Sequence, residues 1–170
     1  TLGEFLGDIK QIPPMVSAVH HEGERLYELA RRGITVERQP RTVTIFELEP
    51  LSPGSWPTQL EYGARGNVRV RCSRGTYIRT LCEDICRKLG IAGHMGALTR
   101  TATSGFALDE AVTLEELERL ASLGSLSWAI KPPLRGVRHL PSLSLTEGEA
   151  ESVRHGTAFE ADVGRIMNAR

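Results

Sequence analysis

The sequence predicts an α+β fold, with a mixed, mainly antiparallel sheet and flanking helices. Residues 41–48 and 68–73 have the alternating apolar and polar pattern of strands, and residues 76–89 carry apolar side chains at helical spacing. Two more stretches, 24–32 and 113–123, are typical of short helices. Because these elements do not follow a regular strand-helix-strand order, the pattern argues against a doubly wound parallel sheet.

Turn and capping residues set the ends of these elements. Thr113 with Glu116, and Thr146 with Glu149, have the spacing of capping boxes that open helices. Glycines follow the predicted helices and indicate their ends, namely Gly33, Gly90, Gly124 and Gly156. Prolines between residues 131 and 141 interrupt the pattern, so we expect a domain boundary near residue 138.

The composition is that of an ordinary globular protein. Of the 170 residues, 40% are hydrophobic and 25% are charged. No apolar run approaches the roughly 20 residues that cross a bilayer, and no signal-peptide pattern is visible. The three cysteines do not form a disulfide framework. We therefore expect a cytoplasmic protein that does not insert into a membrane.

Positive charge is concentrated in one segment of a neutral chain. Lys plus Arg and Asp plus Glu both number 21, which argues against binding of nucleic acid through bulk positive charge. Residues 62–82 nevertheless contain no acid and five arginines, which are Arg65, Arg69, Arg71, Arg74 and Arg79. Two interpretations stay open: a solvated arginine face on a strand, or a surface that binds phosphate groups.

The junction between the predicted strand 68–73 and the helix 76–89 is the best candidate for a functional site. Gly75 permits a sharp turn, and Thr76 is expected to cap the helix. Tyr77 and Arg79 then fall in the first helical turn, where an arginine can bind a phosphate or orient a carboxylate. Upstream, the two prolines in residues 11–18 predict an extended loop.

A zinc site is disfavoured by the spacing of the cysteines. Cys82 and Cys86 share a helix face, and His94 follows them, but the chain lacks the second tight pair that structural zinc sites use. We expect no metal.

Three ordered stretches resemble the tRNA pseudouridine synthase B family of bacterial type. The first runs from Gly7 through Gln11-Ile12-Pro13-Pro14 to Arg31. The second contains Arg74-Gly75-Thr76-Tyr77-Ile78-Arg79, and the third runs from His94 to Phe106. The resemblance implies a pseudouridine synthase fold and an isomerase that converts uridine 55 of the tRNA T-loop to pseudouridine, without a cofactor or metal. It also implies the T-stem-loop of tRNA as partner and a monomeric full-length protein.

The resemblance assigns roles to three residues. Arg79 would pair with the catalytic aspartate, Tyr77 would line the base pocket, and Leu98 would pack against the base. We also expect Arg74 and Arg100 to contact the substrate. Residues 1–138 would be the C-terminal part of the catalytic domain, and residues 139–170 the start of a small, incomplete RNA-binding domain of PUA type.

Departures from the family pattern limit what this chain can do alone. The glycine-rich segment that carries the family's catalytic aspartate has no counterpart in the sequence, and neither does its base-stacking tyrosine. His20 stands at the usual lysine and Thr99 at a usual arginine. We therefore expect part of a longer protein, inactive by itself. A non-catalytic RNA-binding module and a guide-RNA-dependent relative are the alternatives.

Overall fold

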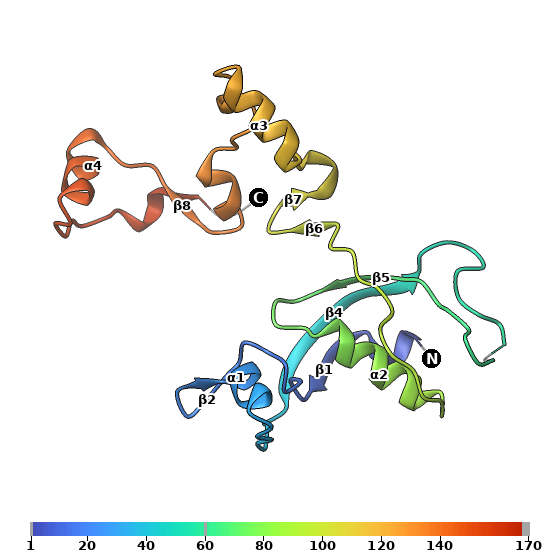
Figure 1. Ribbon diagram of the computed structural model, residues 1–170. Helices are drawn as coiled ribbons and strands as arrows, with labels where there is room; N and C mark the ends of the chain where they lie inside the picture. The colour runs from blue at the N-terminus through green and yellow to red at the C-terminus, as the bar shows by residue number, and fades with distance from the viewer. Residues whose placement is uncertain (1, 60, 168–170) are drawn as a thin grey trace. The chain divides into compact units, whose positions relative to one another are not determined.

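The computed structural model describes residues 2–59 and 61–167, and the chain divides into two compact units, residues 1–98 and 99–170. The helices and strands of the first unit (Figure 1) are η1 (Leu2–Phe5), β1 (Gly7–Gln11), β2 (His20–His21), β3 (Glu24–Arg25), α1 (Leu26–Arg31), β4 (Arg41–Pro50), β5 (Val68–Cys72) and α2 (Ile78–Lys88). Those of the second unit are β6 (Ala102–Thr103), β7 (Phe106–Ala107), η2 (Leu108–Glu110), α3 (Leu114–Ser122), η3 (Leu126–Trp128), η4 (Pro133–Val137), β8 (Ser142–Leu143), α4 (Glu147–Arg154), η5 (Val163–Arg165) and β9 (Ile166–Met167). The predicted α+β class with antiparallel strands is confirmed.

The main sheet of the first unit has three antiparallel strands in the order β1-β4-β5. The long central strand β4 buries Val43, Ile45 and Leu48, while Phe46 and Glu47 are exposed. The register with β5 shifts between Ile45 and Glu47, which is a β-bulge. The bulge explains why the buried positions change from spacing two to spacing three, a break that the alternation of the sequence alone does not predict.

Helix α2 packs its apolar stripe against this sheet. Leu81 and Ile85 are 1% and 4% exposed and form a cluster with Ile45 and Leu48 of β4. Ile78 lies at the edge of the same cluster. Fully burying one such side chain stabilises the fold by roughly 1.5–3 kcal/mol, so this cluster fixes α2 firmly on the sheet.

The expectation that Thr76 caps α2 is wrong. The helix begins at Ile78 and its N-cap residue is Tyr77. The Thr76 hydroxyl instead donates a hydrogen bond to the carbonyl oxygen of Ser73, at 2.9 Å. That bond lies within the turn of residues 73–76, and the helix starts one residue later than a Thr76 cap would place it.

The second unit contains no buried residue among those that the structure describes. Local contacts hold its helices instead. The Thr113 side chain accepts a hydrogen bond from the Glu116 amide at the start of α3, and the capping box of Thr146 and Glu149 opens α4 as predicted. Its hairpins are short, with two residues in each strand of the β6–β7 and β8–β9 pairs.

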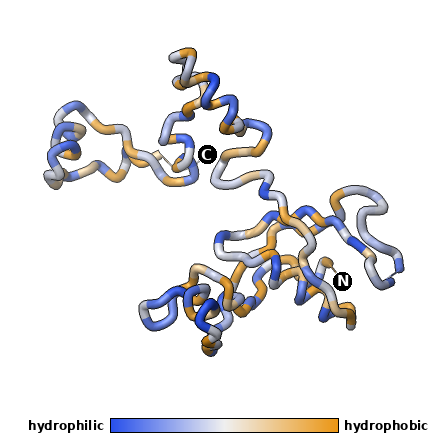
Figure 2. Tube along the Cα trace, in the orientation of Figure 1, coloured by the Kyte–Doolittle hydropathy of each residue, from blue (hydrophilic) through white to orange (hydrophobic). Residues whose placement is uncertain are grey.

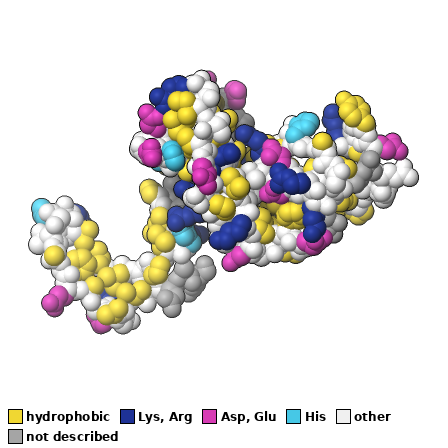
Figure 3. Space-filling view, turned by 90° about the horizontal axis from the view of Figure 1, so that it is seen from below, with side chains coloured by type: hydrophobic (Ala, Val, Ile, Leu, Met, Phe, Trp, Pro, Cys, Tyr) yellow, Lys and Arg dark blue, Asp and Glu magenta, His cyan; other side chains and the backbone are white. Residues whose placement is uncertain are grey.

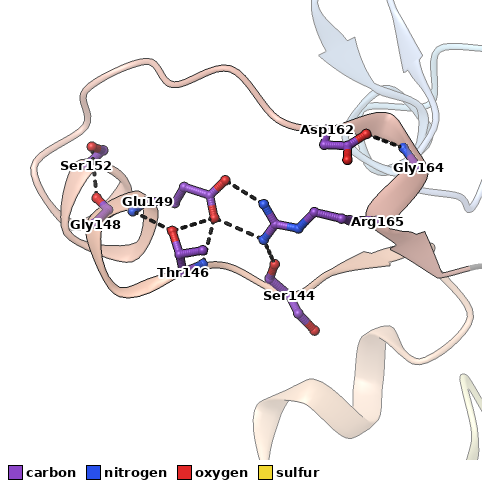
Figure 4. Close-up of polar contacts among 8 residues, drawn as sticks. All are labelled: Ser144, Thr146, Gly148, Glu149, Ser152, Asp162, Gly164 and Arg165. Atoms are coloured by element: carbon purple, nitrogen blue, oxygen red, sulfur yellow. Dashed lines mark hydrogen bonds and ion pairs between the residues drawn. The ribbon is translucent and has the colours of Figure 1, made fainter.

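An ion pair between Glu149 of α4 and Arg165 of η5 ties these two elements together (Figure 4). The Arg165 guanidinium donates to both carboxylate oxygens of Glu149, at 2.8 and 3.0 Å, and also to the carbonyl oxygen of Ser144. The hydrogen bonds from Arg165 and Thr146 lower the pKa of Glu149 to about 2. This contact supplies a link between segments in a unit whose described residues form no buried core.

The helices in the described parts of the chain are short. The longest, α2, has 11 residues, and none is both long and apolar enough to cross a membrane. Figure 2 shows that hydrophobic and hydrophilic stretches alternate over short distances along the chain.

Candidate nucleic-acid-modifying site

The turn between β5 and α2 is held rigidly from the strand side. Ser73 extends the pairing of β5 beyond its last residue, because its amide donates to the Thr44 carbonyl at 2.8 Å and its hydroxyl accepts from the Thr44 amide at 3.0 Å. Gly75 then takes φ = +84°, a conformation that a side chain disfavours. The turn therefore leaves the sheet at a fixed point and direction.

Tyr77 is fixed through its backbone by a residue far away in the sequence. The side-chain amide of Gln11 accepts a hydrogen bond from the Tyr77 N–H at 3.0 Å and donates one to the Tyr77 carbonyl oxygen at 3.2 Å. Gln11 is only 2% exposed. The two prolines in residues 11–18 predict only a loop there and indicate no role for Gln11. The signal in the sequence is a glutamine at the end of a strand, directly before a proline-containing loop.

Arg74 and Arg79 are the free cations of this turn. Both side chains are exposed, and neither has a hydrogen bond or an ion pair within residues 2–59 and 61–167. Arg79 lies one residue inside α2, and Arg74 lies in the turn itself. Their donors are therefore available to a carboxylate or phosphate from another segment or molecule.

The arginines on the strand itself are already paired. Arg71 forms an ion pair with Glu47 at 2.8 Å and its guanidinium lies 5.1 Å from the centre of the Phe46 ring. Arg69 lies 4.0 Å from Glu49. Figure 3 likewise shows basic side chains beside acidic ones on the face that it presents. In the described chain, Arg69 and Arg71 of the predicted arginine-rich face thus lie within ion-pair distance of acids on the neighbouring strand, whereas Arg74 and Arg79 at the turn have no such partner.

The segment after α2 is anchored near its start. The Ile91 amide donates to the Cys86 carbonyl oxygen at 3.0 Å, and a Cβ added to Gly93 would clash with the Cys86 sulfur. Leu98 follows in a stretch without helix or strand, with 57% of its surface exposed. Arg100 is exposed and belongs to the second unit. The structure thus gathers Arg74, Tyr77 and Arg79 in one turn, while Leu98 and Arg100 lie on the following segment.

The cysteines behave as packing residues. All three are free thiols and half-buried, and burial raises the pKa of the Cys82 thiol. In the described ranges, no group of three or more His, Cys, Asp or Glu side chains is arranged to hold a metal ion. The turn therefore offers arginine donors and a tyrosine whose backbone is held by Gln11.

Two family models match consecutive parts of the chain. Residues 1–78 match the model described as TruB family pseudouridylate synthase (N terminal domain). Residues 79–132 match the model described as tRNA pseudouridylate synthase B C-terminal domain. The boundary between the two falls inside the turn that carries Tyr77 and Arg79.

Curated relatives agree with these models. The chain is 44% identical over 169 residues to the tRNA pseudouridine synthase B of Syntrophomonas wolfei, covering 99% of this chain and 54% of that protein. It is 45% identical over 161 residues to the protein of the same name from Streptococcus pneumoniae serotype 4, covering 95% and 54%. The chain thus spans about half the length of these relatives.

A solved structure shows a similar fold. A chain in a crystal structure of a Cbf5–Nop10–Gar1 complex superimposes with a TM-score of 0.68 at 28% sequence identity, covering 92% of this chain and 42% of the other. The family models, the named relatives and this fold all point the same way, and the chain belongs to the TruB family of pseudouridylate synthases.

Proposed function

We propose that the full-length protein containing this chain is a tRNA pseudouridine synthase that isomerises uridine 55 in the T-loop. The observation that carries the proposal is the unbroken match of residues 1–132 to the two family models. In this reaction the bond between N1 of the base and C1′ of the ribose breaks, and a bond between C5 and C1′ forms. The base has to leave the stacked loop first, at a cost of a few kcal/mol.

The turn before α2 supplies the protein groups for this chemistry. Arg79 has no partner among the described residues and extends from a helix that is packed on the sheet. We assign it to pair with a catalytic aspartate that lies outside this chain, which keeps that carboxylate ionised and oriented. Tyr77, whose backbone is held by Gln11, lines the pocket of the flipped base.

The remaining assigned residues act on the substrate. Leu98 is exposed and packs against the base, which excludes water from the pocket. The free guanidinium groups of Arg74 and Arg100 contact tRNA phosphates. Their free charge supports this role, since ion-paired arginines release fewer counterions on binding RNA.

The domain assignment follows the same proposal. Residues 1–138 form part of the catalytic domain, and residues 139–170 form the start of a small RNA-binding domain of PUA type. The full-length protein is a cytoplasmic monomer that binds the T-stem-loop of tRNA. The chain by itself is inactive, because no residue in it matches the aspartate segment of the family.

Tritium release tests the proposal. Forming the C5–C1′ bond expels the hydrogen at C5, so tRNA labelled there with tritium releases label to water as pseudouridine forms. The full-length protein is expected to release one equivalent from wild-type tRNA and none from tRNA with cytidine at position 55. Residues 1–170 alone are expected to release none. Absence of release from the folded full-length protein would refute the activity.

An RNA-binding module without catalysis is the second candidate. The observation that favours it is the pair of exposed guanidinium groups of Arg74 and Arg79, which have no ion pair within the described residues and can bind RNA phosphates. Under this alternative the full-length protein binds tRNA with a steep salt dependence but releases no tritium. The same experiment therefore separates the two functions.

A further inference from the structure

We infer that Gln11 is a positioning residue that sets the place of Tyr77 and the start of α2 for the proposed reaction. The inference rests on the proposed function, because it assigns Gln11 a part in presenting the same site. It concerns a residue that the sequence pattern left as part of a loop.

The contact between Gln11 and Tyr77 uses both ends of one amide group. The carbonyl oxygen of the side chain accepts from the Tyr77 N–H at 3.0 Å, and its NH₂ group donates to the Tyr77 carbonyl oxygen at 3.2 Å. Glutamine offers an acceptor and donors in one plane, so it replaces the two hydrogen bonds that a neighbouring strand would make. Such a double contact fixes the orientation of the peptide groups on both sides of Tyr77.

Gln11 is itself firmly placed. It is the last residue of β1 and pairs with Arg41 in the β1–β4 ladder. Its side chain lies in an enclosed position, with the residue 2% exposed, and Pro13 two residues later is also buried. Since the backbone of Gln11 is held by the sheet and its amide is shielded from water, its hydrogen bonds cannot readily be replaced by solvent.

The Gln11–Tyr77 contact is connected to Arg79 through the first turn of α2. The Tyr77 carbonyl oxygen that accepts from Gln11 also accepts from the Leu81 amide at 3.0 Å, the bond that starts α2. Arg79 lies between these two residues. A displaced Tyr77 carbonyl therefore shifts the first turn of α2, and with it the direction in which Arg79 leaves the helix.

Other side chains cannot reproduce the contact. Asparagine is one methylene shorter, methionine has neither a donor nor a strong acceptor, and glutamate would face the Tyr77 carbonyl with a second acceptor. A set of Gln11 variants therefore removes one or both hydrogen bonds while keeping much of the side-chain volume.

The experiment compares Gln11→Met and the milder Gln11→Asn in the full-length protein. We expect Gln11→Met to lower kcat for tritium release by about tenfold or more while KM for tRNA changes by less than about threefold. Amide hydrogen exchange at Tyr77 is expected to rise by about tenfold. Gln11→Asn is expected to have a kcat between those of Gln11→Met and the unmodified protein. It replaces Gln11→Met as the test variant if Gln11→Met does not fold.

Val43→Ala is the matched control, since Val43 is 5% exposed in the same sheet and pairs with Ile9 rather than with the turn. It is expected to lower Tm as Gln11→Met does, with kcat within about twofold of the unmodified protein. Unchanged kcat in both Gln11 variants, or an equal fall in kcat for Val43→Ala, would overturn the inference alone. Absence of tritium release from the unmodified protein would overturn the proposed function and the inference with it.

Discussion

The arginines of strand β5 and those of the turn that follows it differ in one respect, their acidic partners. Arg69 and Arg71 lie opposite Glu49 and Glu47 on β4 in the antiparallel register. Arg74 and Arg79 lie beyond the last residue pair of that ladder and form no ion pair with the described residues. The comparison shows that a run of basic residues gives free charge only where the fold does not bring acids alongside.

The most severe test of this difference compares Arg79→Ala with Arg71→Ala in the full-length protein. Arg79→Ala is expected to lower the turnover number about a thousandfold, because it removes the group that orients the catalytic carboxylate. Affinity for tRNA is expected to stay within about tenfold, a change below about 1.4 kcal/mol. Arg71→Ala is expected to leave turnover within about threefold. Tritium release and filter binding measure the two quantities.

Two outcomes would contradict this prediction. Equal loss of turnover in both variants would mean that the ion pair with Glu47 does not set Arg71 apart. A loss of tRNA affinity far beyond tenfold in Arg79→Ala would identify Arg79 as a phosphate ligand instead.

Arg79 extends from a helix that is held on the sheet by a buried hydrophobic cluster. Leu81→Ala removes a side chain that is 1% exposed between α2 and the sheet, and it is expected to lower the free energy of unfolding by about 3 kcal/mol. Glu83→Ala, an exposed position on the same helix, is expected to change it by less than about 0.5 kcal/mol. Urea denaturation of the full-length protein measures both. Similar values for the two variants would show that α2 is not anchored through this cluster.

The sequence predicted the elements of this comparison better than it predicted their contacts. Alternation placed the strands at 41–48 and 68–73, and the apolar spacing of residues 76–89 identified the packed face of α2. These patterns are local, so they can be read from the chain directly.

Long-range contacts explain what the sequence could not predict. The neutralisation of Arg69 and Arg71 depends on strand register, and the bulge near Phe46 changes that register. The bond between Gln11 and Tyr77 joins residues that are 66 positions apart. The role of Thr76 was missed because its hydroxyl donates to the Ser73 carbonyl oxygen within the turn, and the helix takes Tyr77 as its N-cap residue.

A smaller effect is expected on RNA binding. Arg74→Ala is expected to weaken tRNA binding about fivefold and to reduce the slope of log affinity against log salt by about one, as loss of a phosphate contact does. Arg69→Ala is expected to change neither quantity measurably, because Glu49 already balances its charge. Binding measured over a range of salt concentrations gives both values.

Removing the acidic partner of Arg69 tests the same role of ion pairing in tRNA binding. Glu49→Gln keeps the shape of the side chain and removes its charge, so it is expected to steepen the salt dependence slightly and to raise tRNA affinity. If Arg69→Ala weakens binding as much as Arg74→Ala does, pairing on the strand does not control which arginines meet RNA.

The smallest effect is expected at a paired arginine of the second unit, the Arg165–Glu149 contact. The folded-state pKa of Glu149 is lowered to about 2, so the contact stabilises the fold fully above the ordinary pKa of 4.5 and loses its contribution as the pH falls toward 2. Hydrogen exchange of the α4 amides at pH 7 and pH 3, compared with Glu149→Gln, isolates this carboxylate from the others. The protection that distinguishes the unmodified protein from Glu149→Gln is expected to shrink at pH 3. A difference that is the same at both pH values would mean that the Arg165–Glu149 contact depends on hydrogen-bond geometry rather than on charge, unlike the pairs that neutralise β5.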